Sequence, residues 1–296
     1  MWAWKLALTG CALLWGGSFV VIKESLDAVP ACSLMALRFL LASLLLGAVC
    51  RCRLRDSLDW SHLFAGGILG VLAGAAYAVQ NVGLTYTTPG RNAFLTAIYC
   101  VLVPFVNWIV ARRRPGAMVL LAAGLCVLGV GLISLGDDLV PSLGMGERLT
   151  LLSALLYAAQ IVCVARFASA HDVMTLTVVQ MTVTCAICWV FSLALGEPQV
   201  DLASLDGSFW WSLAYMVVLA SCACSAIQNA AQIVVPPAQA SLLLSLESVF
   251  AVAASVLFYG ERLTPRLVAG FALIFIAVLA SELGPTLARR APSRRA

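Results

Sequence analysis

Two ionisable residues lie deep inside long apolar stretches of this sequence. Glu247 stands about nine residues into an apolar run, about 13 Å from its end at about 1.5 Å per helical residue. Arg38 is about as deep within another run. A charge in apolar surroundings is costly and therefore suggests a function. We predict that Glu247 carries a proton or binds an amine, unless it is a hydrogen-bonded neutral acid or pairs with Arg38. Arg38 either binds a ligand or braces the helices.

Several polar and aromatic side chains lie at a similar depth in neighbouring runs. They are Trp15, Ser18, Tyr99, Tyr157, Gln160 and Gln180. Aromatic residues of membrane proteins usually collect at the interfaces, so Trp15 and Tyr157 at mid-depth are unusual. Their rings can stack on a flat molecule or hold a cation, or they can simply fill the core. With Arg38 and Glu247, these residues form the predicted substrate-binding set.

The sequence contains no pattern typical of catalysis. HExxH, GxSxG and phosphate-binding loops are all missing. Cys185 and Cys188 have the CxxC spacing of a metal or redox site, but no second CxxC and no histidine lie nearby, so we interpret them as packing residues. We therefore predict no catalytic residue, no metal and no cofactor. The net charge of +4 comes from short basic clusters between apolar runs, which predicts no nucleic-acid partner.

Composition indicates a chain that lies mostly in lipid. Hydrophobic residues make up 62% and charged residues 11% of the 296 positions, against about 25% charged residues in soluble domains. Many apolar runs reach about 20 residues, enough to cross a core of about 30 Å. We expect an all-α membrane protein with about ten transmembrane helices, near residues 5–26, 31–50, 61–84, 91–111, 117–135, 148–168, 172–195, 209–234, 238–258 and 264–283.

The chain also repeats itself. At an offset of about 148 residues, Gln80–Asn81 matches Gln228–Asn229 and Tyr99 matches Glu247. At an offset of about 142 residues, Trp15 matches Tyr157, Ser18 matches Gln160 and Arg38 matches Gln180. About five helices in each half is an odd number, so the halves must cross the membrane in opposite directions. This predicts two inverted five-helix repeats, 1–142 and 143–284, followed by a basic cytoplasmic tail, 285–296.

Other residues are predicted to control packing or movement. The amide pairs Gln80–Asn81 and Gln228–Asn229 lie near opposite ends of their helices, where they suit gates or hydrogen bonds between helices. Pro104 should kink the fourth helix, either as a hinge or as a structural feature. Gly66, Gly70 and Gly74 are spaced for close helix contact, which we expect within the chain rather than in a dimer.

The basic residues predict the topology. With the N-terminus inside, twelve Lys and Arg residues lie on the cytoplasmic side and five lie outside, while Arg38 is within a helix. Positive residues favour the cytoplasmic side. We therefore expect an inner-membrane protein with both termini in the cytoplasm.

Four stretches of the chain resemble the EamA-type permeases of the drug/metabolite transporter superfamily. They are ALLWGGSFVVIK (Ala12–Lys23), ALRFLLA (Ala36–Ala42), GLTYTTPGRNAFLTAIYCVLVPF (Gly83–Phe105) and ASLLLSLESVFAVAASVLFYGERLTP (Ala240–Pro265). The resemblance implies ten helices in two inverted repeats and secondary-active movement of small metabolites, such as amino acids. In one departure, Ser248 follows Glu247 where the family commonly has proline, so the ninth helix is expected to lack the kink of the fourth.

Taken together, these features predict a secondary-active exporter of small organic metabolites that works by alternating access around a midplane cavity. We expect the first, second, fourth, sixth, seventh and ninth helices to line this cavity. The expected partners are a small-molecule substrate, the lipid bilayer and, as coupling ion, the proton. The alternatives are an uncoupled facilitator and an integral membrane enzyme acting on lipid. The sequence does not indicate an oligomeric state.

Overall fold

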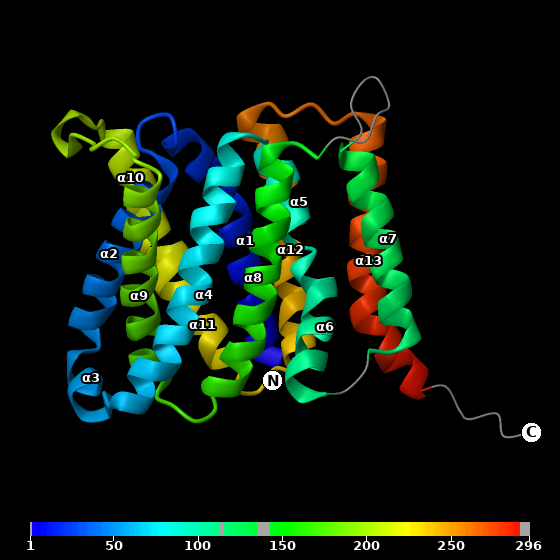
Figure 1. Ribbon diagram of the computed structural model, residues 1–296, viewed down its shortest axis with the longest axis horizontal. Coiled ribbons are helices and arrows are strands. Elements are labelled where there is room, and N and C mark those ends of the chain that lie inside the picture. The colour runs from blue at the N-terminus through cyan, green and yellow to red at the C-terminus, as the bar shows by residue number, and fades with distance from the viewer. Residues whose placement is uncertain (1, 113–114, 135–142, 291–296) are drawn as a thin grey trace, which may run out of the picture.

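The protein is an all-helical bundle, seen in a computed structural model that describes residues 2–112, 115–134 and 143–290 (Figure 1). Eight helical segments of the described chain are long and apolar enough to cross a membrane. Two shorter apolar helices, Leu120–Leu132 and Pro265–Ala280, bring the number to ten. The predicted fold class is therefore confirmed. Residues 291–296 of the predicted basic tail lie outside the described residues.

The first half begins at the lower edge of the bundle in Figure 1, and its described residues form seven helices. They are α1 (Trp2–Ser25), α2 (Ala31–Val49), α3 (Arg51–Ser57), α4 (Trp60–Thr85), α5 (Pro89–Thr96), α6 (Tyr99–Ala111) and α7 (Ala117–Ser134). The short helix α3 was not predicted from the sequence. It carries no buried residue, so the apolar pattern used to predict the spans gives no sign of it.

The second half begins at the opposite edge of the bundle (Figure 1). Its helices are α8 (Met145–Phe167), α9 (Val173–Ala194), α10 (Gly207–Tyr215), α11 (Cys224–Ala231), α12 (Pro237–Ala254) and α13 (Pro265–Arg290), with a short 3₁₀ turn at Leu202–Ser204. Two π-helical stretches, Met216–Ala223 and Ser255–Tyr259, interrupt regular α-geometry. Because of the first, the eighth span is α10, a π-helical stretch and α11, and not the single helix predicted over 209–234.

The fourth span differs from its prediction as one helix. It is broken at Ala97 and Ile98, where the backbone tightens to bonds three residues apart, such as Cys100 N–H to Ala97 O at 3.1 Å. Pro104 lies beyond the break, inside α6, and cannot donate a helical hydrogen bond. The corresponding helix α12 runs through Ser248 without a break. The break precedes Pro104, and the ninth span departs from α-geometry at Ser255–Tyr259. The kink expected at Pro104 therefore stays a prediction.

The two halves meet along a contact between α4 and α9. Gly66 faces Val179, Gly70 faces Val183, and Gly74 faces Ile187. A Cβ on any of these glycines would come within 2.5 to 2.7 Å of the facing side chain, so only glycine permits this approach. The residue numbers rise together, so α4 and α9 run parallel, although they are the third and second long helices of their halves. The glycine spacing therefore serves packing within the chain, as predicted.

A pair of helices stands at the edge of the bundle. α7 and α13 pack on each other, with Gly129 against Ile274, and lie to the right in Figure 1. The ring of Phe271 in α13 stacks on Phe94 in α5, with centroids 4.2 Å apart. This pair is attached to the remaining eight spans without entering their centre, so the site must be sought among the other helices.

Candidate functional site

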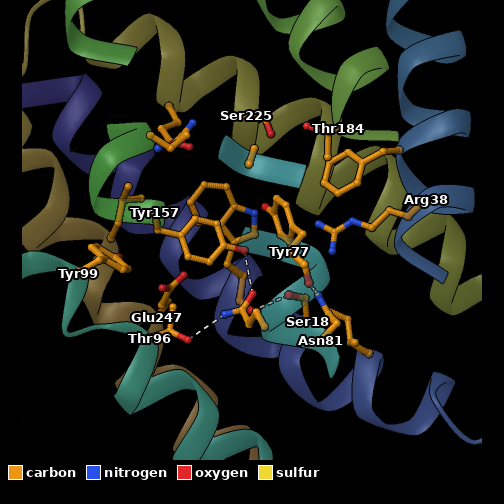
Figure 2. A pocket seen from close by; sticks show the side chains of 18 of the residues that line it. Ser18, Arg38, Tyr77, Asn81, Thr96, Tyr99, Tyr157, Thr184, Ser225 and Glu247 are labelled. Carbon is orange, nitrogen blue, oxygen red and sulfur yellow. Dashed lines mark hydrogen bonds between the residues drawn. The ribbon is translucent and has the colours of Figure 1, made fainter. Parts of the chain in front are cut away.

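A cavity lies between the helices at the centre of the bundle (Figure 2). It has about 850 Å³ of unoccupied space, open solvent at its mouth included. The described lining comes from α1, α2, α4, α5, α6, α8, α9, α11 and α12. The predicted lining from six spans was thus incomplete, since α4 and α11 contribute as well. All eight residues of the predicted substrate-binding set line this one cavity: Trp15, Ser18, Arg38, Tyr99, Tyr157, Gln160, Gln180 and Glu247.

Arg38 lines the cavity and is almost fully buried, with 1% of its surface exposed. Its Nε donates to Ser221 Oγ at 2.7 Å, and Nη1 approaches the sulfur of Met35 at 3.9 Å. The guanidinium carbon lies 5.2 Å from the ring centroid of Phe39 and 5.5 Å from that of Tyr77. These contacts fix the direction of the guanidinium by hydrogen bonding and by cation–π attraction.

Glu247 enters the cavity from α12, on the side away from Arg38 (Figure 2). It is 6% exposed, and Tyr99 lies beside it in Figure 2. Gly16 allows α1 to pack closely behind it, since a Cβ there would lie 2.7 Å from the backbone oxygen of Glu247. The described residues form no ion pair between Glu247 and Arg38. The structural pairing considered from the sequence is therefore wrong.

Aromatic rings occupy the space between the two charged residues. Tyr77 packs against Phe39 with centroids 4.8 Å apart and against Tyr157 edge-on at 5.4 Å. Trp15 is fixed by a hydrogen bond from its Nε1 to the backbone oxygen of Ala220 at 2.6 Å. The rings thus form a rigid wall, whose faces are suited to flat or cationic groups.

The first predicted amide pair braces this wall. Gln80 donates from Nε2 to Thr96 Oγ1 at 2.9 Å and accepts from the Tyr157 hydroxyl at 2.8 Å (Figure 2). It therefore joins α4 to α5 and α8. Asn81 also lines the cavity and donates to the backbone oxygen of Tyr77 at 2.7 Å. The contacts of Gln80 fit the alternative predicted for the pair, hydrogen bonding between helices, whereas the bond of Asn81 lies within α4.

The second amide pair is divided between cavity and core. Gln228 lines the cavity, whereas Asn229 is fully buried behind it. Asn229 donates to Thr177 Oγ1 at 2.9 Å and to Gln180 Oε1 at 3.0 Å, which joins α11 to α9. Pro104 does not line the cavity. Of the five residues predicted for gating or packing, Gln80, Asn81 and Gln228 thus reach the cavity.

Sequence reasoning missed some of the lining. Tyr77, Thr96, Ser225 and Leu244 all line the cavity, and the repeat offset of 148 pairs Tyr77 with Ser225 and Thr96 with Leu244. Each lies a few residues from a position that the repeat had already matched. Extending the repeat in both directions would therefore have found them. Thr184 also lines the cavity. At the offset of 142 it pairs with Ala42, which does not line the cavity, so the repeat does not point to Thr184.

The comparisons with known proteins agree with this architecture. A model of the EamA-like transporter family matches twice, over residues 2–135 and 144–282, and so covers most of the chain. The chain belongs to the EamA-like transporter family. An uncharacterised transporter of Archaeoglobus fulgidus is similar to this EamA-like transporter, with 29% identity over 282 residues, 94% of this chain and 85% of the relative.

A crystal structure shares the fold of this EamA-like transporter. It superposes with a TM-score of 0.68 at 20% identity, over 97% of this chain and 99% of the other. At that identity the likeness supports the fold alone. Membership of a transporter family, rather than any missing motif, sets aside the membrane-enzyme alternative. The protein is an integral multi-pass membrane transporter, and the central cavity is its candidate substrate site.

Proposed function

We propose that this EamA-like transporter is a secondary-active exporter of small organic metabolites such as amino acids, and that it alternates access around the central cavity. The observation that carries this proposal is the convergence of five repeat-matched pairs on one cavity. The pairs are Trp15 with Tyr157, Ser18 with Gln160, Arg38 with Gln180, Gln80 with Gln228 and Tyr99 with Glu247. Inverted repeats around a central site can exchange conformations, which opens the site to each side in turn.

The proposal includes the arrangement in the cell. The halves are 1–142 and 143–284, with a basic tail over 285–296, and both termini lie on the cytoplasmic side of the inner membrane. The excess of Lys and Arg on that side supports this orientation. Labelling of single cysteines placed near the termini, with a reagent that does not cross membranes, tests it. Labelling from outside intact cells would contradict the orientation.

Glu247 is the proposed site of proton coupling, because it is a buried carboxyl that lines the cavity. Flux of amino acids, nucleosides and organic cations into proteoliposomes, with and without a pH gradient, tests coupling. Accumulation only under the gradient is expected. Replacement of Glu247 by Gln should abolish the effect of the gradient, while Glu24→Gln, at an exposed position, should not.

An uncoupled facilitator is the second candidate. It predicts equilibration without accumulation under any ion gradient. Undiminished, pH-driven accumulation by the Glu247→Gln variant would show instead that transport is coupled through another residue.

A further inference from the structure

The short helix α3 has a basic and apolar side. It carries no buried residue, and so short a helix is not stable in water by its own hydrogen bonds. Arg51, Leu54, Arg55 and Leu58 recur at helical spacing and therefore lie on one side, with Asp56 on the opposite side. Basic residues beside leucines on one side of a helix are typical of a helix that lies at a membrane surface.

Two of the three arginines of α3 are available to an anion. Arg51 and Arg55 are exposed, and neither forms an ion pair with any residue that the structure describes. Arg53 is instead directed at the second half, where its Nη1 lies 3.7 Å from Asp172 Oδ2 at the start of α9. Asp59 accepts from a backbone N–H of α4 as its N-cap. The guanidinium groups of Arg51 and Arg55 are thus left to bind an anion, and phosphate suits them well.

An apolar groove runs along the outer face of α4. Its described lining is apolar or glycine and extends from Trp60 to Leu72, which is about 18 Å at about 1.5 Å per residue. The groove is hollowed at Gly67, where nothing would lie within 4 Å of a Cβ. Trp60 and Phe64 are 80% and 61% exposed. The groove therefore has the length of about one leaflet, since the whole hydrocarbon core is about 30 Å thick.

The arginines and the groove adjoin. Figure 1 shows α3 at the lower edge of the bundle, where α4 begins. Only Leu58 and Asp59 separate the end of α3 from Trp60, so the backbone of Arg55 lies at most about 18 Å from that of Trp60. A phospholipid has the same layout, with a phosphate at the membrane surface and an acyl chain that runs into one leaflet.

We propose that α3 and the groove on α4 form a binding site for an anionic phospholipid. Its phosphate binds Arg51 and Arg55, and one acyl chain lies in the groove. The charge selects the headgroup, because a choline group would bring a second positive charge to the arginines, whereas a glycerol group would not. Because Arg53 joins α3 to the second half through Asp172, the bound lipid also stabilises a contact between the halves.

Lipid titrations of the full-length protein in a neutral detergent test this site. Dioleoylphosphatidylglycerol and dioleoylphosphatidylcholine have the same acyl chains and differ in charge. Binding is measured as the lipid-dependent rise in Tm and as lipid adducts in native mass spectrometry. Phosphatidylglycerol should bind at least about tenfold more tightly than phosphatidylcholine, since two basic residues act on its charge. Inorganic phosphate has the charge without the chains and should bind at least about tenfold more weakly than phosphatidylglycerol.

Variants separate the two parts of the site. Arg51→Gln combined with Arg55→Gln should reduce the preference for phosphatidylglycerol to about twofold or less. Gly67→Leu fills the groove and should weaken the binding of both lipids by the same factor, about fivefold or more, with the preference retained. Arg166→Gln, at an exposed arginine in the last turn of α8, is the control for charge. Gly124→Leu, on α7 and with nothing within 4 Å of a Cβ, is the control for the groove.

The outcomes separate this site from general effects of lipid. Equal binding of the two lipids by the wild-type protein would overturn the proposal, as would a preference that survives the double arginine substitution. An equal loss in Arg166→Gln would show a general effect of charge, and an equal loss in Gly124→Leu a general effect of bulk, and each would overturn it too. Phosphate that binds as tightly as phosphatidylglycerol would contradict the role of the groove. None of these measurements involves transport, so their failure would leave the proposed function unchanged, and an absence of flux would leave the lipid site unchanged.

Discussion

The two halves of the protein place their side chains alike around the cavity but give them different chemistry. The matched positions with the largest contrast are Arg38 with Gln180 and Tyr99 with Glu247. The first half thus supplies the positive charge, and the second half supplies the negative one. Duplication sets where a side chain lies, whereas substitution at the matched position sets what it can bind. A symmetric backbone can therefore hold an asymmetric ligand.

The same contrast appears in how the halves pack. α4 is a continuous helix whose glycines contact α9 closely. Its counterpart in the second half is the segment from Gly207 to Ala231, which contains the π-helical stretch and packs beside α2. In the first half, α4 approaches α9 closely because glycines at the contact have no side chains. The corresponding segment of the second half has side chains at the matched positions and contains a π-helical stretch instead.

A side chain placed at the glycine contact between α4 and α9 should destabilise the protein most. In Gly70→Val, the new Cβ would lie 2.5 Å from the Cβ of Val183 and 2.7 Å from the backbone oxygen of Gln180. We expect a loss of about 3 kcal/mol or more in the free energy of unfolding, because the backbones must separate. Gly67→Val is the matched control, since nothing lies within 4 Å of a Cβ there. Equal stability of the two variants in micelles would show that the halves do not depend on this contact.

Removal of Ser221, the hydrogen-bond partner of Arg38, should destabilise the protein less. Ser221→Ala makes this position the same in both halves, since the matched residue is Ala73. It removes the 2.7 Å hydrogen bond to Arg38 Nε, which should cost about 1.5–2 kcal/mol of unfolding free energy for a bond to a charged group. Ser212→Ala, in the same segment, is the control. If Ser221→Ala unfolds like the wild type in a denaturant titration, Ser221 does not hold the guanidinium.

The helix N-termini at matched positions differ in how they are capped. Asp172 caps its own helix, α9, by accepting from Thr175 N–H at 2.9 Å. α2 has no side-chain cap of its own, and Glu197 from the other half accepts from the N–H groups of Cys32 and Ser33 at 2.9 and 2.8 Å. Burial raises the pKa of Glu197, but these hydrogen bonds outweigh burial and hold its pKa below the ordinary value.

The capping of α2 by Glu197 predicts that the stability of the folded protein depends modestly on pH. Because the pKa of Glu197 is lower in the folded protein, its contribution is present above the ordinary value of 4.5 and is lost as pH falls through the folded pKa. Glu197→Gln should cost about 1 kcal/mol at pH 7. Its Tm should approach that of the wild type as the pH is lowered from 4.5 through the folded pKa of Glu197. A difference in Tm that stays constant with pH would contradict this role, and Glu24→Gln serves as the control.

Much of this architecture could be predicted from the sequence. Hydropathy located the ten spans, since each span must be apolar to lie in lipid. The repeat then brought Trp15, Arg38, Tyr157 and Glu247 together without any structure, because matched residues on inverted halves face one central axis. The roles of these residues in binding remain predictions.

Other features could not be predicted, for physical reasons. The break at Ala97 and Ile98 and the π-helical stretches leave the apolar composition unchanged, so hydropathy does not register them. The capping of α2 by Glu197 joins residues 164 or more positions apart, and no local pattern encodes such a contact. The lack of an ion pair between Arg38 and Glu247 depends on side-chain distances that spacing along the chain does not give.

The π-helical stretch Met216–Ala223 has one further consequence. A π turn holds more residues than an α turn, so the residues beyond the stretch are rotated about the helix axis relative to a continuous α-helix. Trp210 and Trp211, before the stretch, are exposed on the outside of the bundle, while Ser225 and Gln228, beyond it, line the cavity. The same span therefore turns one face outward before the π-helical stretch and another face to the cavity beyond it. Substitutions on the outward face need not alter the residues that face the cavity.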